Sequence, residues 1–135
     1  MSEPLYVLVV DDSVQIRALL SHALRLRGLK PVEADGGAAA LRLVMTTPFA
    51  IAIIDQHMPG MTGAELIRFV RGSPDPRVRT VPIIGLSGRP GSEQELLAAG
   101  AEVFLPKPFG EAELAAALRL ALANRLGRAG SAGAA

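Results

Sequence analysis

The chain has 135 residues, the size of one ordinary domain. Its 14 lysines and arginines nearly balance 13 aspartates and glutamates, so no basic excess attracts a nucleic acid backbone or an anionic membrane surface. Cysteine is absent, which excludes disulfides and thiolate metal sites. No apolar run approaches the roughly 20 residues of a membrane span, and no secretory signal stands at the start. These features predict a cytoplasmic, single-domain protein that binds neither nucleic acid nor membrane.

Short β-branched runs alternate along the chain with stretches of helical spacing. We expect strands at 5–10, 30–34, 50–54, 81–86 and 102–105, and helices at 13–27, 37–46, 63–71, 91–99 and 111–126. The first, third and fourth runs are nearly all apolar, as strands covered on both faces are, whereas the second is more polar and is predicted to lie at an edge. Five strands alternating with five helices predict an α/β fold, a parallel sheet between two helical layers.

The two ends of the chain differ in composition. Residues 1–126 contain all the predicted elements and form the expected domain. Residues 127–135 are rich in Gly and Ala and have no apolar periodicity, so we expect a flexible tail or linker stub there.

Charged and hydroxyl side chains follow four of the five predicted strands, where sites form in open parallel sheets. Asp11 and Asp12 end the first strand, and Asp55 ends the third. Ser87 ends the fourth, and Lys107 follows the fifth. Three carboxylates in one crevice repel one another, and a hard cation such as Mg²⁺, together with Lys107, would neutralise them. Such a site suits a phosphoryl group, with Asp55 as the carboxylate nucleophile.

Each of these residues also has an ordinary structural interpretation. Asp12 or Ser13 can cap a helix, and Asp55 can be a turn residue. Ser87 can be a strand-end hydroxyl, and Lys107 a solvated charge. Taken singly, each residue fits the structural interpretation better. Their joint placement after four different strands favours a functional site.

Four motifs, in this order and at these intervals, resemble the receiver domain of two-component response regulators over about residues 5–126. They are VLVVDD (7–12), IIDQHMPGMTG (53–63), PIIGLSG (82–88) and GAEVFLPKPF (100–109). The resemblance implies a chemotaxis-receiver-like, flavodoxin-like sheet with strand order 2-1-3-4-5. It also implies a phosphorelay function, in which the domain takes a phosphoryl group from a sensor histidine kinase or a phosphotransfer protein.

The resemblance also assigns roles at the predicted metal site. Asp55 would be the phosphoacceptor. Asp12 would bind Mg²⁺ directly, and Asp11 would do so through water. His57 occupies the position whose backbone carbonyl completes the metal site, so its side chain need not be a ligand.

Three further residues would bind the phosphoryl group or take part in the conformational switch. Ser87 would hydrogen-bond a phosphoryl oxygen, and Lys107, joined to Pro108 by an expected cis bond, would pair with the group. Phe104 holds the position of the switch aromatic. The family often has Thr then Ala where this chain has Ser87 and Gly88, and Tyr is commoner than Phe104, but neither departure removes the chemistry.

The implied output surface comprises the helix at 91–99, the strand at 102–105 and the last helix. Four residues of the last helix form the stripe that should face the core: Leu114, Leu118, Ala121 and Leu122. Leu120 falls opposite, beside Ala116 and Ala117. A patch at Leu120 and Ala116 would serve a downstream partner or self-association, although single exposed leucines are also common without function.

Several other functions lack their motifs. No Gly-rich dinucleotide or P-loop pattern occurs, and the segment 85–89 departs from that of a serine hydrolase. Three acids would repel a flavin phosphate. Two alternatives stay open: an interaction module of this fold that takes no phosphate, and a phosphatase-type enzyme with His57 as its acid or base. We expect a signalling domain rather than an enzyme.

Overall fold

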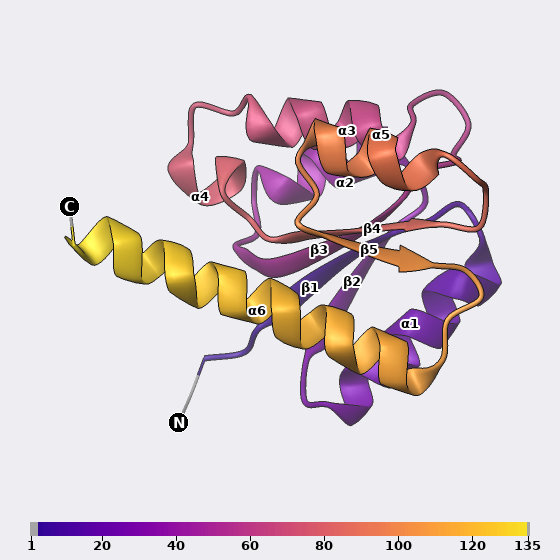
Figure 1. Cartoon of the computed structure of the whole chain (residues 1–135), viewed down its shortest axis with the longest axis horizontal. Helices are drawn as coiled ribbons and strands as arrows, with labels where there is room; N and C mark the ends of the chain where they lie inside the picture. Colours follow the sequence, from indigo (N-terminus) through magenta and orange to yellow (C-terminus); the bar gives the residue numbers. More distant parts are fainter. Residues whose placement is uncertain (1–2, 135) are drawn as a thin grey trace.

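The computed structural model describes the backbone of residues 3–134 and the side chains of residues 3–124. Five parallel strands form one sheet with the order β2-β1-β3-β4-β5, and helices cover both of its faces (Figure 1). The strands are β1 (Tyr6–Val10), β2 (Lys30–Ala34), β3 (Phe49–Asp55), β4 (Ile83–Ser87) and β5 (Val103–Pro106). The helices are α1 (Val14–Leu26), α2 (Gly37–Val44), α3 (Gly63–Arg71), α4 (Pro76–Arg79), α5 (Ser92–Ala99) and α6 (Glu111–Ala134). The expected α/β sandwich and its strand order are confirmed.

An apolar cluster fills the space on each face of the sheet. The helices α2, α3 and α5 cover one face, and α1 and α6 cover the other (Figure 1). The three central strands are buried almost throughout because both of their faces contact helices, whereas β2 at the edge is partly exposed. This packing explains why the central strands read as continuous apolar runs in the sequence.

The register of the sheet brings the strand ends together. Val10 at the end of β1 pairs with Ile54, and Asp55 pairs with Leu86. Ser87 pairs with Pro106 at the end of β5. The carboxyl ends of four strands therefore lie along one edge of the sheet. Binding sites of open parallel sheets form at this edge.

The structure has one helix more than expected in the described part of the chain, and its last helix is longer. The short helix α4 is capped by Asp75, whose side chain accepts a hydrogen bond from the backbone N–H of Arg77 at 2.9 Å, and Pro76 lies in its first turn. Four residues are too few to show helical periodicity. The helix α6 continues past residue 126 to Ala134: the segment has no proline to stop it, although its glycines have low helix propensity. Residue 135 lies outside the described residues.

One residue of α6 faces the core against expectation. Ala117 is 3% exposed, because it lies three residues after Leu114 and so on the same side of the helix. Leu120 is 58% exposed, as expected. None of the helices within residues 3–134 combines the length and the apolar character that a membrane crossing requires.

Candidate functional site

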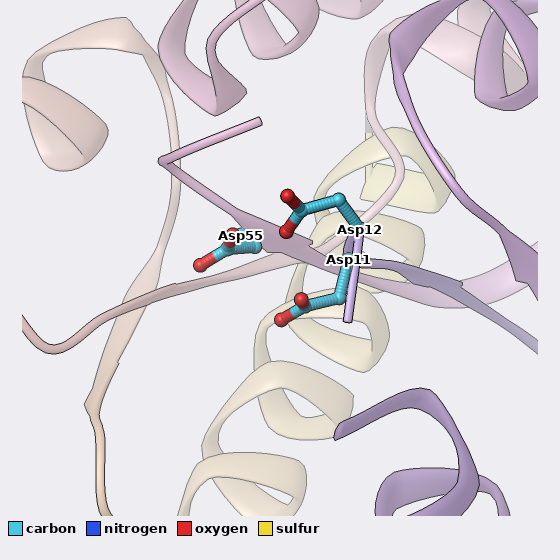
Figure 2. A group of neighbouring side chains, drawn as sticks. All are labelled: Asp11, Asp12 and Asp55. Atoms are coloured by element: carbon cyan, nitrogen blue, oxygen red, sulfur yellow. The ribbon is translucent and has the colours of Figure 1, made fainter. Parts of the chain in front are cut away.

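Three carboxylates meet at the carboxyl ends of β1 and β3 (Figure 2). Asp11 and Asp12 directly follow β1, and Asp55 is the last residue of β3. One oxygen atom of each carboxylate lies within 4.8 Å of those of the other two. Asp11 and Asp55 are buried, whereas Asp12 is exposed. The structure thus brings together the three acids that the strand ends predicted.

Lys107 bridges the two buried carboxylates. Its Nζ lies 2.9 Å from Oδ2 of Asp11 and 3.0 Å from Oδ1 of Asp55. The backbone N–H of Lys107 donates to the carbonyl of Ser87 at 2.9 Å, which ties the end of β5 to the end of β4. The bond between Lys107 and Pro108 is cis, as expected.

The charges of the site shift the pKa of two of its groups. Burial raises the pKa of Asp55 above its ordinary value, Asp11 and Asp12 add to the rise, and the hydrogen bond from Lys107 opposes it. Burial lowers the pKa of Lys107, but its bonds to Asp11 and Asp55 outweigh burial and raise it overall. Lys107 therefore stays protonated at neutral pH.

The cluster suits a hard divalent cation. Its donor atoms are all carboxylate oxygens, and Lys107 balances only part of their charge. The exposed side of the cluster, at Asp12, leaves room for the water and phosphate oxygens that Mg²⁺ keeps among its ligands. The side chain of His57 turns away toward α5, where Nε2 lies 3.0 Å from Oγ of Ser92. The role expected of its carbonyl stays a prediction.

The loop after β3 is packed tightly beneath Asp55. The N–H of Gly63 donates to the carbonyl of Gln56 at 2.9 Å, and a Cβ atom at Gly63 would overlap the backbone oxygen of Asp55. Only glycine fits this close approach, which explains its place in the motif. Thr62 and Glu65 then form a capping box that starts α3 and lowers the pKa of Glu65.

The residues expected to read a phosphoryl group lie at β4 and β5. Ser87 is buried, and its Oγ accepts a hydrogen bond from the N–H of Arg89 at 3.0 Å. Phe104 is half-buried against the cluster under α3 and α5. On α6, Leu120 is exposed and Ala116 is half-buried.

Two polar side chains beside the site received no role from the sequence. Gln56 is buried, accepts from the N–H of Ala64 at 2.8 Å and donates to Glu95 at 2.7 Å, so it links α3 to α5. Its position, a polar residue directly after Asp55, is the signal that could have identified it. Arg17 on α1 donates from Nη1 to the backbone carbonyl of Asp11 at 2.7 Å.

Removing the charge of Asp55 should stabilise the fold at neutral pH. Because the folded-state pKa is raised, the ionised carboxyl destabilises the folded state above that pKa, and this penalty disappears as the pH falls through it. We expect Asp55→Asn to raise the free energy of unfolding by about 1 kcal/mol at pH 7 and by less near pH 4. Urea unfolding at both pH values measures this. Asp35→Asn, at an exposed carboxylate, should change little, and a less stable Asp55→Asn at pH 7 would contradict the account.

Comparison with known proteins gives a consistent picture. Residues 7–119 match the response regulator receiver domain family. The transcriptional regulatory protein KdpE of Mycobacterium tuberculosis is 38% identical over 118 residues, which are 86% of this chain and 50% of KdpE. The solved structure of the chemotaxis response regulator CheY4 of Vibrio cholerae has a TM-score of 0.81 and 35% identity, covering 89% of this chain and 100% of CheY4.

A further solved structure is the receiver domain of the sensor histidine kinase PA1611 from Pseudomonas aeruginosa, with a magnesium ion coordinated in its active-site cleft. It has a TM-score of 0.79 and 26% identity, and covers 88% of this chain and 98% of that domain. The chain spans about half the length of KdpE. The strand order, the acidic cluster and the match over residues 7–119 agree, and the chain belongs to the response regulator receiver domains of two-component systems.

Proposed function

We propose that this receiver domain accepts a phosphoryl group on Asp55 from a sensor histidine kinase or a phosphotransfer protein. The observation that carries the proposal is the position of the Asp55 carboxylate, buried at the sheet edge beside two further carboxylates and 3.0 Å from the ammonium of Lys107. A carboxylate so placed is a nucleophile with cationic support at hand.

The transfer forms one bond and breaks one. An oxygen of Asp55 attacks the phosphorus atom, the new O–P bond forms, and the P–N bond to the donor histidine breaks. The bonding electrons leave with the imidazole nitrogen. Lys107 holds the attacking carboxylate in place and balances negative charge on the phosphoryl oxygens.

Asp11, Asp12 and Asp55 would hold Mg²⁺, with the backbone carbonyl of His57 as a further ligand. The magnesium ion in the cleft of the PA1611 receiver domain supports this assignment. When bound, the ion supplies positive charge that stabilises the phosphoryl oxygens during transfer.

The phosphorylated state is read by Ser87 and Lys107. Phosphorylation adds nearly two negative charges and strong acceptor oxygens, which favour a conformation in which both side chains donate to them. The switch then moves Phe104, which is half-buried beside α5, and changes the surface formed by α5, β5 and α6. Such a shift needs contacts made in one state only, and these two donors provide them.

Loss of either donor should uncouple phosphorylation from the switch. Lys107→Ala and Ser87→Ala should still be labelled at Asp55, more slowly, but should lose most of the amide chemical-shift change across residues 87–109 on adding a beryllofluoride mimic. The same shift pattern in Lys107→Ala as in wild type would show that the switch does not run through this pair.

The exposed leucine of α6 offers a test of the output face. If this face mediates self-association, Leu120→Lys should abolish association induced by the mimic without affecting the labelling of Asp55. Light scattering with and without the mimic measures association. Association that is unchanged in Leu120→Lys would remove Leu120 from the interface, and its absence in wild type would point to a different protein as partner.

Incubation of wild type with acetyl phosphate and Mg²⁺ tests the proposed function itself. We expect the intact mass to increase by one phosphoryl group that hydroxylamine removes. An interaction module without phosphoacceptor chemistry would gain no mass. A phosphatase-type enzyme would instead release phosphate from external phosphoesters over many turnovers.

A further inference from the structure

Arg17 on α1 joins the end of β1 to the edge strand β2. Its side chain is only 15% exposed. Nη1 donates to the backbone carbonyl of Asp11 at 2.7 Å, and Nε donates to Oε1 of Glu33 at 3.1 Å. The other carboxylate oxygen of Glu33 accepts from Oγ of the buried Ser21 at 2.9 Å. Both carboxylate oxygens of Glu33 are thus hydrogen-bonded, and the fixed carboxylate in turn fixes the orientation of the Arg17 guanidinium.

Asp11 is held at every polar atom. Its contacts are N–H to the carbonyl of Ala34 at 3.2 Å, Oδ1 to the N–H of Ser13 at 2.9 Å, Oδ2 to Nζ of Lys107 at 2.9 Å, and the carbonyl to Nη1 of Arg17 at 2.7 Å. The contact with Arg17 is special, because that carbonyl belongs to the peptide that joins Asp11 to Asp12.

The orientation of this peptide decides where Asp12 points. Asp12 is exposed, so its backbone rather than surrounding side chains sets the direction of its carboxylate. Figure 2 shows the carboxylates of Asp11 and Asp12 pointing to the same side as that of Asp55. A rotation of the peptide would turn Asp12 away from the other two.

We infer that Arg17 is a positioning residue for the divalent cation: it fixes the peptide between Asp11 and Asp12 so that both carboxylates face Asp55. The inference rests on the proposed function, in which the three acids bind Mg²⁺. Groups that orient metal ligands from behind change metal affinity by roughly 10–100-fold when they are removed.

The charge of Arg17 alone predicts the opposite effect. A guanidinium close to the acidic cluster repels an incoming cation, so its removal would tighten Mg²⁺ binding if charge were its only contribution. A purely structural role would lower the stability of the fold and leave the affinity of the remaining folded protein unchanged. Of the three roles, only a positioning role predicts that a folded Arg17 variant binds Mg²⁺ more weakly.

Amide NMR titration with MgCl₂ separates these possibilities. We expect Arg17→Ala to raise the Kd for Mg²⁺ about tenfold. Arg17→Lys should raise it about threefold, because an ammonium lacks the fork that contacts the carbonyl and Glu33 together. Arg27→Ala is the matched control: Arg27 follows the same helix and pairs with Glu111 at 3.0 Å, far along the chain from the acids, and its loss should leave the Kd unchanged. Thermal unfolding of the same samples shows that each variant is folded.

The outcomes are distinct. A wild-type protein that binds no Mg²⁺ would overturn the proposed metal site and this inference with it. Binding by wild type, with an equal or lower Kd in Arg17→Ala, would overturn the inference alone and leave the proposed function standing. If Arg17→Ala does not fold, Arg17→Lys decides: a Kd equal to that of wild type contradicts the positioning role.

Discussion

Asp55→Asn is expected to take up no phosphoryl group from acetyl phosphate, whereas wild type gains one. The side-chain amide of asparagine is not a competent nucleophile and cannot form the acyl phosphate. Asparagine has nearly the same size, and its Oδ1 can still accept the hydrogen bond from Lys107, so the site should otherwise persist. Intact mass spectrometry after incubation measures the difference.

The control for this experiment is Asp35→Asn, which changes an exposed carboxylate at the end of β2 and should be labelled like wild type. Equal labelling of Asp55→Asn and wild type would remove Asp55 from the role of phosphoacceptor. Partial labelling of Asp55→Asn would mean that a second carboxylate of the cluster accepts the group.

Removal of Mg²⁺ is expected to have an effect of similar size. With EDTA in excess, labelling by acetyl phosphate should stop, because Lys107 alone does not balance three carboxylates and an incoming phosphoryl group. Asp12→Ala should weaken Mg²⁺ binding and slow labelling together, the latter by about two orders of magnitude. Asp12 is exposed, so this variant should fold like wild type.

The rate of labelling as a function of MgCl₂ concentration measures both effects, with Asp35→Ala as the control. Labelling that continues unchanged in EDTA would show that the acidic cluster has another purpose. Weaker Mg²⁺ binding without slower labelling would separate the cation from the transfer.

The carboxyl-end residues of the strands could be predicted from sequence because parallel strands must end at one edge. Asp11, Asp12 and Asp55 follow short, β-branched apolar runs, which favour buried strands, and the structure places the three acids together. Ser87 and Lys107 lie where the same rule puts them, joined through the backbone at 2.9 Å. The parallel topology of the sheet therefore predicts where most of the site residues lie.

The contacts that hold the site could not be predicted in the same way. The pair of Arg17 and Glu33 depends on how α1 lies against β2, and the link from Gln56 to Glu95 depends on how close α5 approaches β3. Such distances follow from packing rather than from sequence pattern.

The exact bounds of two helices could not be predicted from the sequence pattern either. The four residues of α4 are set by a cap and a proline, not by periodicity, and α6 continues through a segment whose composition suggested a tail. Ala117 faces the core because it lies about 60° from Leu114 around the helix axis. The expected stripe of four residues did not include it.

Identification of the modified residue tests the central claim most directly. Sodium borohydride reduces an aspartyl phosphate to homoserine, which peptide sequencing by mass spectrometry locates. After incubation with acetyl phosphate and Mg²⁺, we expect homoserine at residue 55 alone, and none in a sample that was not phosphorylated. Homoserine at Asp11 or Asp12, or its absence from protein that has gained a phosphoryl group, would contradict the assignment of Asp55 as the phosphoacceptor.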